Sequence, residues 1–222
     1  MLKEIPDLLT PSQVATLRDI AAKASFADGR LTNVHNKAKN NLQLADQAAY
    51  EQSARLMLAA MAAHEDFRNH SFASAIMPPV MSIYEPGMAY GPHADAAFIT
   101  LPNQTTIRSD VSCTIFLEDP DEYDGGALLI RLGTTELRIK GKPGSAILYP
   151  SDTMHEVEPV TRGRRLAAFC FMQSRIADPW RREMLYEINE IAALEGLNMD
   201  WANYSRLQLF REKLMRHWAD KP

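Results

Sequence analysis

Apolar residues recur at helical spacing in the first part of the chain. The segment Thr10-Pro11-Ser12-Gln13 has the composition of a helix start, because it offers a capping threonine, a proline at the first position and a glutamine that can complete a capping box. Apolar positions then follow at steps of three, at Val14, Leu17 and Ile20. A second, alanine-rich helical pattern runs from about residue 46 to 67. Residues 28–43 are polar and are predicted to be irregular.

The residue pattern changes after residue 71, where short apolar runs are separated by glycine, proline and aspartate. Such runs lie at 72–84, 111–117, 127–132, 136–140, 145–149, 155–160 and 166–172. Short strands at regular spacing with turn residues between them are typical of an all-β sandwich or barrel. Residues that favour turns occur together in two segments, Asp124-Gly125-Gly126 and Gly141-Lys142-Pro143-Gly144.

Helical spacing returns after Ser174. Asp178 can cap a helix that has Pro179 at its first position. The last helix carries one apolar stripe with steps of three or four, at Trp201, Tyr204, Leu207, Phe210, Leu214 and Trp218. We expect this stripe to pack into the core, and a dimer contact is the alternative.

Composition and charge narrow the class of protein. The chain has 222 residues, of which 46% are hydrophobic and 23% charged, as in an ordinary globular domain. A net charge of −4, with no block of lysine and arginine, argues against nucleic acid as a partner. Cys113 and Cys170 make no disulfide framework and are predicted to be buried small hydrophobes. Without a signal peptide or an apolar run long enough to cross a membrane, we expect a soluble, cytoplasmic protein.

The first candidate for chemistry is His93-Ala94-Asp95. The preceding residues, from Tyr84 to Pro92, are rich in turn formers. In an extended strand, residues two apart share a face, so the imidazole and the carboxylate would point into one space. Two histidines and one carboxylate on one face of a metal ion are typical of non-haem Fe(II) oxygenases. Taken alone, the pair also fits two surface residues.

The second half of the candidate site lies at the last two apolar runs, 155–160 and 166–172. His155 opens a strand directly after a Pro-Ser-Asp turn, and Arg165 lies ten positions later on the next strand. By a period of two, Arg165 shares a face with Ala167, Phe169 and Phe171. An arginine on the inner face of a barrel needs an anion, and its planar fork suits a carboxylate. The alternative is a structural arginine paired with an aspartate or glutamate.

Together these residues resemble the Fe(II)/2-oxoglutarate dioxygenases, in particular the prolyl-hydroxylase-like branch and its bacterial PKHD-type hydroxylases. The family pattern is His-x-Asp, a distal histidine and a basic residue ten positions beyond it. The resemblance runs from about Met77 to Ser174. It extends to four flanking stretches, which are residues 108–117, 119–126, 148–151 and 159–163.

The resemblance implies a mainly β protein with flanking helices (α+β), whose core is a double-stranded β-helix, or jelly roll. We expect this core at residues 77–174, between an N-terminal helical support region at 1–76 and a C-terminal helical extension at 175–222. It also implies Fe(II), 2-oxoglutarate and O2 as cofactor and cosubstrates, with ascorbate dependence as a further implication.

The resemblance also assigns roles to individual residues. It makes His93, Asp95 and His155 the catalytic iron ligands and Arg165 the partner of the distal carboxylate of 2-oxoglutarate. Tyr84 matches a tyrosine whose hydroxyl helps to hold 2-oxoglutarate, and Tyr90 is the competitor for that role. A second tyrosine of some relatives falls near Phe116, which has no hydroxyl.

The implied activity is hydroxylation of a C–H bond with release of succinate and CO2. The substrate stays open between a peptide or protein side chain and a small metabolite, including natural-product and siderophore-related molecules. The alternatives are a barrel that senses iron or 2-oxoglutarate without turnover, a cupin-like barrel with another metal, and a nucleic-acid demethylase. The segment 96–109 is predicted to be mostly irregular, either as a lid or as a plain surface loop. Arg108 at its end is open between a substrate contact and a salt bridge.

Overall fold

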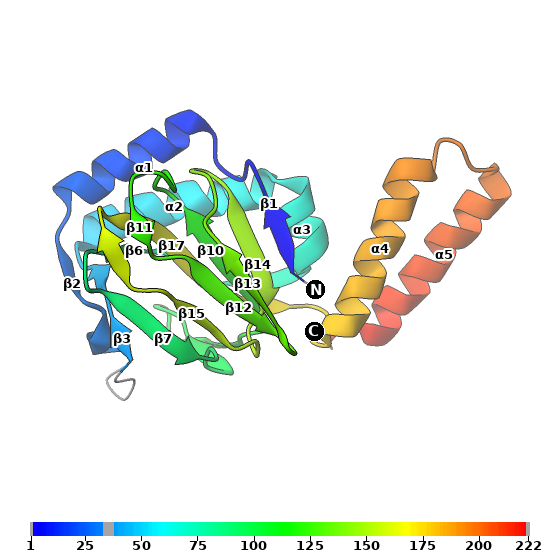
Figure 1. Cartoon of the computed structure of the whole chain (residues 1–222). Helices are drawn as coiled ribbons and strands as arrows, with labels where there is room; N and C mark the ends of the chain where they lie inside the picture. Colours follow the sequence, from blue (N-terminus) through cyan, green and yellow to red (C-terminus); the bar gives the residue numbers. More distant parts are fainter. Residues whose placement is uncertain (1, 33–37, 221–222) are drawn as a thin grey trace.

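Two antiparallel sheets form a flattened barrel in the computed structural model, which describes residues 2–32 and 38–220 (Figure 1). The larger sheet has the order β1-β14-β10-β17-β6-β4-β2, with β5 also paired to β17. Its strands are β1 Lys3–Ile5, β2 Phe26–Asp28, β4 Leu42–Leu44, β5 Ala73–Ile76, β6 Val80–Tyr84, β10 Val111–Phe116, β14 Ala146–Pro150 and β17 Arg165–Ser174. The smaller sheet has the order β13-β12-β15-β7-β3. Its strands are β3 Lys39–Asn40, β7 Ala89–His93, β12 Leu128–Leu132, β13 Thr135–Ile139 and β15 His155–Val157.

Two short ribbons complete the strands. They pair β8 Phe98–Thr100 with β9 Thr106–Arg108, and β11 Asp124–Gly125 with β16 Val160–Arg162. All seven apolar runs of the sequence contain observed strands, whereas β1, β2, β3, β4 and β7 of the two sheets lie outside these runs.

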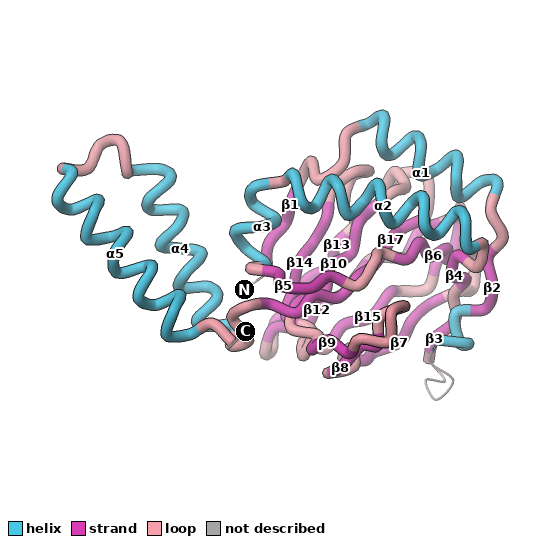
Figure 2. The backbone as a smooth tube through the Cα atoms, turned by 180° about the vertical axis from the view of Figure 1, so that it is seen from behind, coloured by secondary structure: helices cyan, strands magenta, loops and turns pink. Residues whose placement is uncertain are grey.

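Three helices cover the outer face of the larger sheet, as Figure 2 shows from behind. They are α1 Pro11–Lys23, α2 Gln47–Ala63 and α3 Glu65–Ser71, and a short 3-10 turn, η1, spans Gly29–Thr32. The predicted capping box is present, because Thr10 Oγ1 accepts from the backbone of Gln13 and Gln13 Oε1 accepts from the backbone of Thr10. The helix expected over 46–67 is two helices, since α2 ends at Ala63 and α3 begins two residues later.

The larger sheet is buried on both faces, which explains its continuous apolar runs. Along β17, Leu166, Ala168 and Cys170 belong to the core beneath the helices. The residues between them line the space between the two sheets. Cys113 and Cys170 lie opposite each other on β10 and β17, and both are buried free thiols, as predicted.

Three local predictions were wrong. The segment 28–43 is not irregular throughout, because it contains β3 and the first two residues of β4. Residues 33–37 of this segment lie outside the described residues. The 96–109 segment forms the β8–β9 hairpin. The stretch before His93 is a strand, β7, despite Pro92, which lies where the register with β15 shifts and a missing N–H is tolerated.

The C-terminal helices, α4 Pro179–Glu195 and α5 Trp201–Trp218, form a hairpin that projects from the barrel (Figures 1 and 2). Leu214 and Trp218 pack against the buried cluster of Phe72, Ile176, Leu185 and Tyr186. At the other end of the stripe, Trp201 is 76% and Phe210 54% exposed. The expectation of a core stripe is therefore wrong for that end, because the hairpin extends beyond the barrel it would pack on. No helix within the described ranges has the length and apolarity to cross a membrane.

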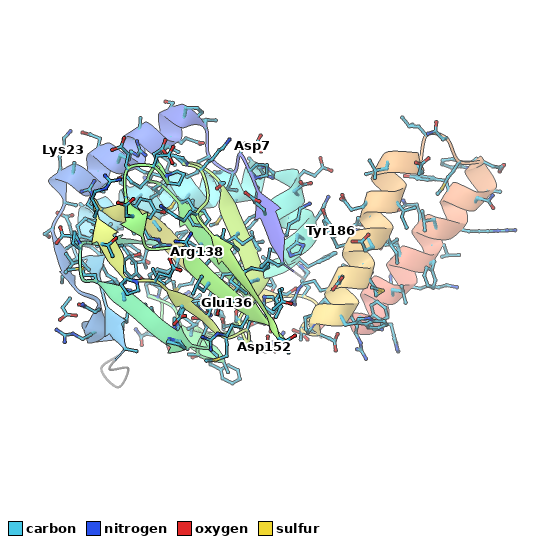
Figure 3. The ribbon with its side chains drawn as sticks, in the orientation of Figure 1. Asp7, Lys23, Glu136, Arg138, Asp152 and Tyr186 are labelled. Carbon is cyan, nitrogen blue, oxygen red and sulfur yellow. The ribbon has the colours of Figure 1, made fainter. Side chains whose placement is uncertain are left out.

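The contact between the hairpin and the barrel includes a buried histidine. His70 of α3 is 3% exposed and meets Tyr186 of α4 edge-on, with ring centroids 5.2 Å apart. Tyr186 lies on the barrel side of α4 (Figure 3) and accepts a hydrogen bond from Lys3. Burial, and after it the charges of nearby cations, lowers the pKa of His70 from 6.5 to about 3.

This depressed pKa predicts a loss of stability in acid. In the unfolded chain His70 binds a proton below about pH 6.5, whereas in the folded protein it binds one only near pH 3. Protonation therefore favours the unfolded state between these values, and the free energy of unfolding falls as the pH falls. We expect His70→Gln to reduce this slope by up to about 1.4 kcal/mol per pH unit. Urea unfolding of the metal-free protein between pH 7 and pH 4 measures the slope, with His217→Gln on exposed α5 as control. An unchanged slope in His70→Gln would contradict this assignment.

Candidate functional site

Three side chains that can bind a metal converge where β7 and β15 pair. His93 ends β7, His155 opens β15, and the two residues lie opposite each other in the register. Asp95 follows β7 by two residues. Its Oδ1 is 3.9 Å from His93 Nε2 and its Oδ2 is 3.7 Å from His155 Nε2. One ligand atom from each of the three residues lies within 4.8 Å of the others, so a single ion can contact all three.

Backbone carbonyls set which nitrogen of each imidazole faces this space. His93 Nδ1 is 2.8 Å from the carbonyl oxygen of Gly91, and His155 Nδ1 is 2.9 Å from that of Thr153. A carbonyl can only accept, so each Nδ1 carries the hydrogen and each Nε2 offers a lone pair. Burial first, and then the nearby charge of His155, lower the pKa of His93 to about 4, which keeps its imidazole neutral at pH 7.

The carboxylate of the triad is held from behind by a serine pair. Ser112 Oγ donates to Asp95 Oδ2 at 2.6 Å and lies 2.8 Å from Ser151 Oγ. Burial raises the pKa of Asp95, against the lowering effects of His155 and of the Ser112 hydrogen bond. A carboxylate buried in this way is destabilised by desolvation, and a divalent cation would offset that cost.

Arg165 and Tyr84 lie together deeper in the same space. They are register partners on β17 and β6, and the guanidinium lies 5.0 Å from the centre of the Tyr84 ring. Arg165 is 2% exposed, and its Nε is buried without a hydrogen-bond partner. Tyr123 is within hydrogen-bonding reach of the guanidinium. Across the described part of the chain, no aspartate or glutamate forms an ion pair with Arg165, so the structural alternative for this residue is not supported.

The Tyr84 hydroxyl remains a proton donor at neutral pH. Burial raises the pKa of Tyr84 to about 12, although the charge of Arg165 and a hydrogen bond from Asn41 act in the opposite direction. Tyr90, the competing tyrosine, lies elsewhere. Its ring stacks on His93, with centroids 3.6 Å apart and planes at 15°.

One cavity of about 780 Å³ connects these groups. All five residues predicted for the site line it, namely Tyr84, His93, Asp95, His155 and Arg165. Phe98 and Ile99 of the β8–β9 hairpin border the same cavity, but Arg108 does not. Arg108 instead forms ion pairs with Asp110 and Asp220, both at 2.6 Å, so the salt-bridge alternative holds for this residue.

Known proteins with this arrangement identify the family. Residues 79–173 match the model of the 2OG-Fe(II) oxygenase superfamily. A PKHD-type hydroxylase of Sphingopyxis alaskensis is 54% identical over 97% of this chain and 98% of its own length. Another, of Paracoccus denitrificans, is 35% identical over 99% of this chain and 100% of its own.

The chain belongs to the PKHD-type hydroxylase family.

Solved structures show the same fold for this hydroxylase at lower identity. A prolyl-4-hydroxylase of Pseudomonas putida superposes with a TM-score of 0.58 at 22% identity, over 78% of this chain and 92% of that one. A prolyl hydroxylase of Trichoplax adhaerens, in complex with a hypoxia inducible factor peptide fragment, gives 0.60 at 14% identity, over 78% and 83%. These likenesses confirm the expected jelly-roll core with helices packed outside it.

The residues of the hydroxylase cavity fit the groups that its family uses, Fe(II) and 2-oxoglutarate. Two imidazoles and one carboxylate are the donor set of non-haem Fe(II) oxygenases. The orphaned Nε of Arg165 is a buried cationic donor that lacks an acceptor, and the distal carboxylate of 2-oxoglutarate would supply one. The family and the site together make this chain a 2-oxoglutarate-dependent dioxygenase that hydroxylates its substrate.

Some residues of the hydroxylase site were not predicted from the sequence. Ser112 lies in an apolar strand, and its polarity at a cavity-facing position was an available signal. Lys39 and Asn41 are 6% and 3% exposed and line the cavity from a segment expected to be irregular. That segment has no periodicity that separates inner from outer positions, so no sequence pattern indicated these two residues.

Proposed function

We propose that this hydroxylase binds Fe(II) through His93, Asp95 and His155 and 2-oxoglutarate through Arg165 and Tyr84. One observation carries the proposal, which is that a buried two-histidine, one-carboxylate cluster shares a cavity with a buried arginine without a carboxylate partner. A cupin-like site with another metal would not need Arg165. A sensor or a nucleic-acid demethylase has no specific observation in its favour.

Each residue has a defined task in this proposal. The Nδ1–H bonds of His93 and His155 to backbone carbonyls hold both rings with Nε2 toward the ion. Ser112 orients Asp95 by donating to one carboxylate oxygen. With iron and 2-oxoglutarate bound, oxidative decarboxylation by dioxygen yields succinate and CO2 and transfers one oxygen atom to a substrate C–H bond.

Arg165 and Tyr84 select a dicarboxylate among 2-oxo acids. The guanidinium offers parallel N–H donors to both oxygens of a carboxylate, and the Tyr84 hydroxyl supplies a further donor beside it. The Tyr84 ring below the guanidinium also limits its orientation. A 2-oxo acid with an apolar end would leave this buried cation uncompensated.

We also propose that the hydroxylase acts in the cytoplasm. Cys113 and Cys170 face each other on neighbouring strands as free thiols. Reduced cysteines in this arrangement fit a compartment that keeps thiols reduced.

Removal of a proposed iron ligand is the first test. We expect His155→Ala to weaken Fe(II) binding at least ~100-fold and to abolish succinate formation, because two ligands cannot hold the ion in this cavity. Anaerobic Fe(II) titration measures the affinity, and circular dichroism checks folding. His64→Ala, between α2 and α3, is the matched control. Full iron occupancy with succinate production in His155→Ala would refute the ligand assignment.

Removal of the proposed 2-oxoglutarate anchor is the second test. We expect Arg165→Ala to raise the Kd for 2-oxoglutarate on the order of 100-fold while Fe(II) stays bound, because a buried carboxylate would lose its charge partner. Arg165→Lys should be milder, since lysine keeps the charge but not the fork. The absorption change on adding 2-oxoglutarate to the Fe(II) protein under argon gives the Kd. Arg164→Ala, at a half-exposed neighbour paired with Glu118, is the control. An unchanged Kd in Arg165→Ala removes this residue from the site.

We further infer that the protein is a homodimer joined through the α4–α5 hairpin. Large apolar side chains are exposed on both helices and on the turn between them, at Ile191, Leu194, Leu197, Trp201, Leu209 and Phe210. Two helices alone form only one layer and cannot bury such side chains, whereas two hairpins can form a four-helix bundle. A second copy presents the same surface, as a symmetric dimer requires.

A charge placed on this surface tests the dimer. We expect the wild-type protein to have twice the chain mass in solution and Phe210→Glu to have the chain mass, because a buried carboxylate would oppose association. Size-exclusion chromatography with light scattering measures both masses. Leu132→Glu, at an exposed leucine of β12, is the matched control. A monomeric wild-type protein would refute the dimer.

A further inference from the structure

A chain of three buried serine hydroxyls ends on Asp95, the carboxylate of the proposed metal site. Ser109 Oγ lies 2.9 Å from Ser151 Oγ, and Ser151 Oγ lies 2.8 Å from Ser112 Oγ, which is 2.6 Å from Asp95 Oδ2. The three serines come from separate segments, since Ser109 follows β9, Ser112 lies in β10 and Ser151 follows β14. The proposed function gives a task to Ser112 alone, so the roles of the other two hydroxyls are open.

The chemistry of the groups fixes the direction of this chain. A hydroxyl carries one hydrogen, and an ionised carboxylate can only accept. Ser112 therefore donates to Asp95, and its contact with Ser151 is one in which Ser151 donates. Because the hydrogen of Ser151 is used there, Ser109 is the donor to Ser151. All three bonds run toward Asp95, and hydrogen bonds aligned in this way polarise one another, which strengthens the last one.

The middle serine belongs to a turn that supports two of the three proposed ligands. The N–H of Thr153 donates to the carbonyl of Pro150 at 3.0 Å, which closes a four-residue turn at the end of β14. Within this turn, the Ser151 carbonyl accepts from the N–H of Asp95 at 3.2 Å, and the Thr153 carbonyl accepts from His155 Nδ1 at 2.9 Å. Ser151 consequently holds Asp95 by its backbone directly and by its carboxylate through the serine chain.

The outer end of the serine chain is fixed by the backbone as well. The N–H of Ser109 donates to the carbonyl of Ala97 at 2.9 Å, which closes the base of the β8–β9 hairpin. On either side of Ser109, Arg108 and Asp110 form an ion pair at 2.6 Å, and the Asp110 carbonyl accepts from the N–H of Ser151 at 3.2 Å. The hydroxyls are therefore held in place before any metal binds, as a preorganised site requires.

We propose that Ser151 and Ser109 are positioning residues that act on Asp95 through Ser112 and leave Asp95 Oδ1 as the oxygen that binds the metal. The Ser112 bond occupies Oδ2, so a metal contact through Oδ2 would compete with the whole chain. This inference rests on the proposed function, because it takes Asp95 as a ligand of Fe(II). Groups that orient a metal ligand typically contribute about 10- to 100-fold to metal affinity.

Anaerobic titration with Fe(II) alone tests the chain, with circular dichroism as the check on folding. We expect Ser151→Ala to raise the Kd for Fe(II) ~10-fold and Ser109→Ala to raise it less, because the polarisation weakens along the chain. Ser151→Thr keeps the hydroxyl and should retain the wild-type Kd. The double variant Ser112→Ala/Ser151→Ala should bind Fe(II) as Ser112→Ala does, since Ser151 acts through Ser112. Ser74→Ala is the matched control, at an exposed strand serine whose hydroxyl donates to a backbone carbonyl.

The outcomes separate this inference from the proposed function. If folded Ser151→Ala binds Fe(II) as the wild-type protein does, or if its loss multiplies with that of Ser112→Ala, the serine chain does not position Asp95 and the inference is wrong although iron still binds. Should Ser151→Ala not fold, Ser109→Ala decides in its place, because the same non-additivity with Ser112→Ala is expected of it. If the wild-type protein does not bind Fe(II), the proposed function itself fails.

Discussion

The pairing of β7 with β15 is the constraint on which the site depends. It places His93 opposite His155 across two neighbouring strands, although the residues are far apart in the sequence. The same pairing brings the turn after β7 toward β10, where Ser112 fixes Asp95. A slip of one residue would turn one imidazole to the other face of the sheet and separate the ligand atoms. The pairing of β15 with β12 at three positions, and of β7 with β3 at two, restrains such a slip.

The charges that this pairing assembles are costly for the empty protein. Asp95 and Arg165 are both nearly inaccessible to solvent, in a barrel that also contains a buried apolar cluster with Phe116 and Ile147. The effective penalty for a buried charge is several kcal/mol, which the protein recovers when oppositely charged groups bind. Folding and binding are therefore linked, because the ligands stabilise only the folded state. The extensive apolar packing of the larger sheet against α1, α2 and α3 stabilises the fold and offsets the cost of the buried charges in the site.

The sequence predicted those parts of the molecule whose residues carry a periodic or a chemical signal. The strand period predicted that Arg165 and Phe171 share one inner face, and the motif pattern predicted that His93, Asp95 and His155 lie close together. Burial was harder to predict where tertiary context decides it. The stripe on α5 has the period of a core helix, yet Trp201 is exposed because no other described part of the chain covers that end of the hairpin. The strand β7 was missed because turn formers such as Pro92 outweighed the pairing with β15, which depends on residues distant in the sequence.

The part of the cavity that the sequence did not reveal is joined to the barrel differently from the candidate metal site. Strands β7, β15 and β17, which carry His93, His155 and Arg165, belong to the two sheets of the barrel, so a change in them also affects the fold. The crossing segment at 39–43 pairs two of its residues with β7 and two with β6, and its residues in β4 also pair with β2. Lys39 and Gln43 line the same cavity as His93, Asp95 and His155, so this connection between the two sheets adds polar side chains to a space that the sheet strands otherwise form.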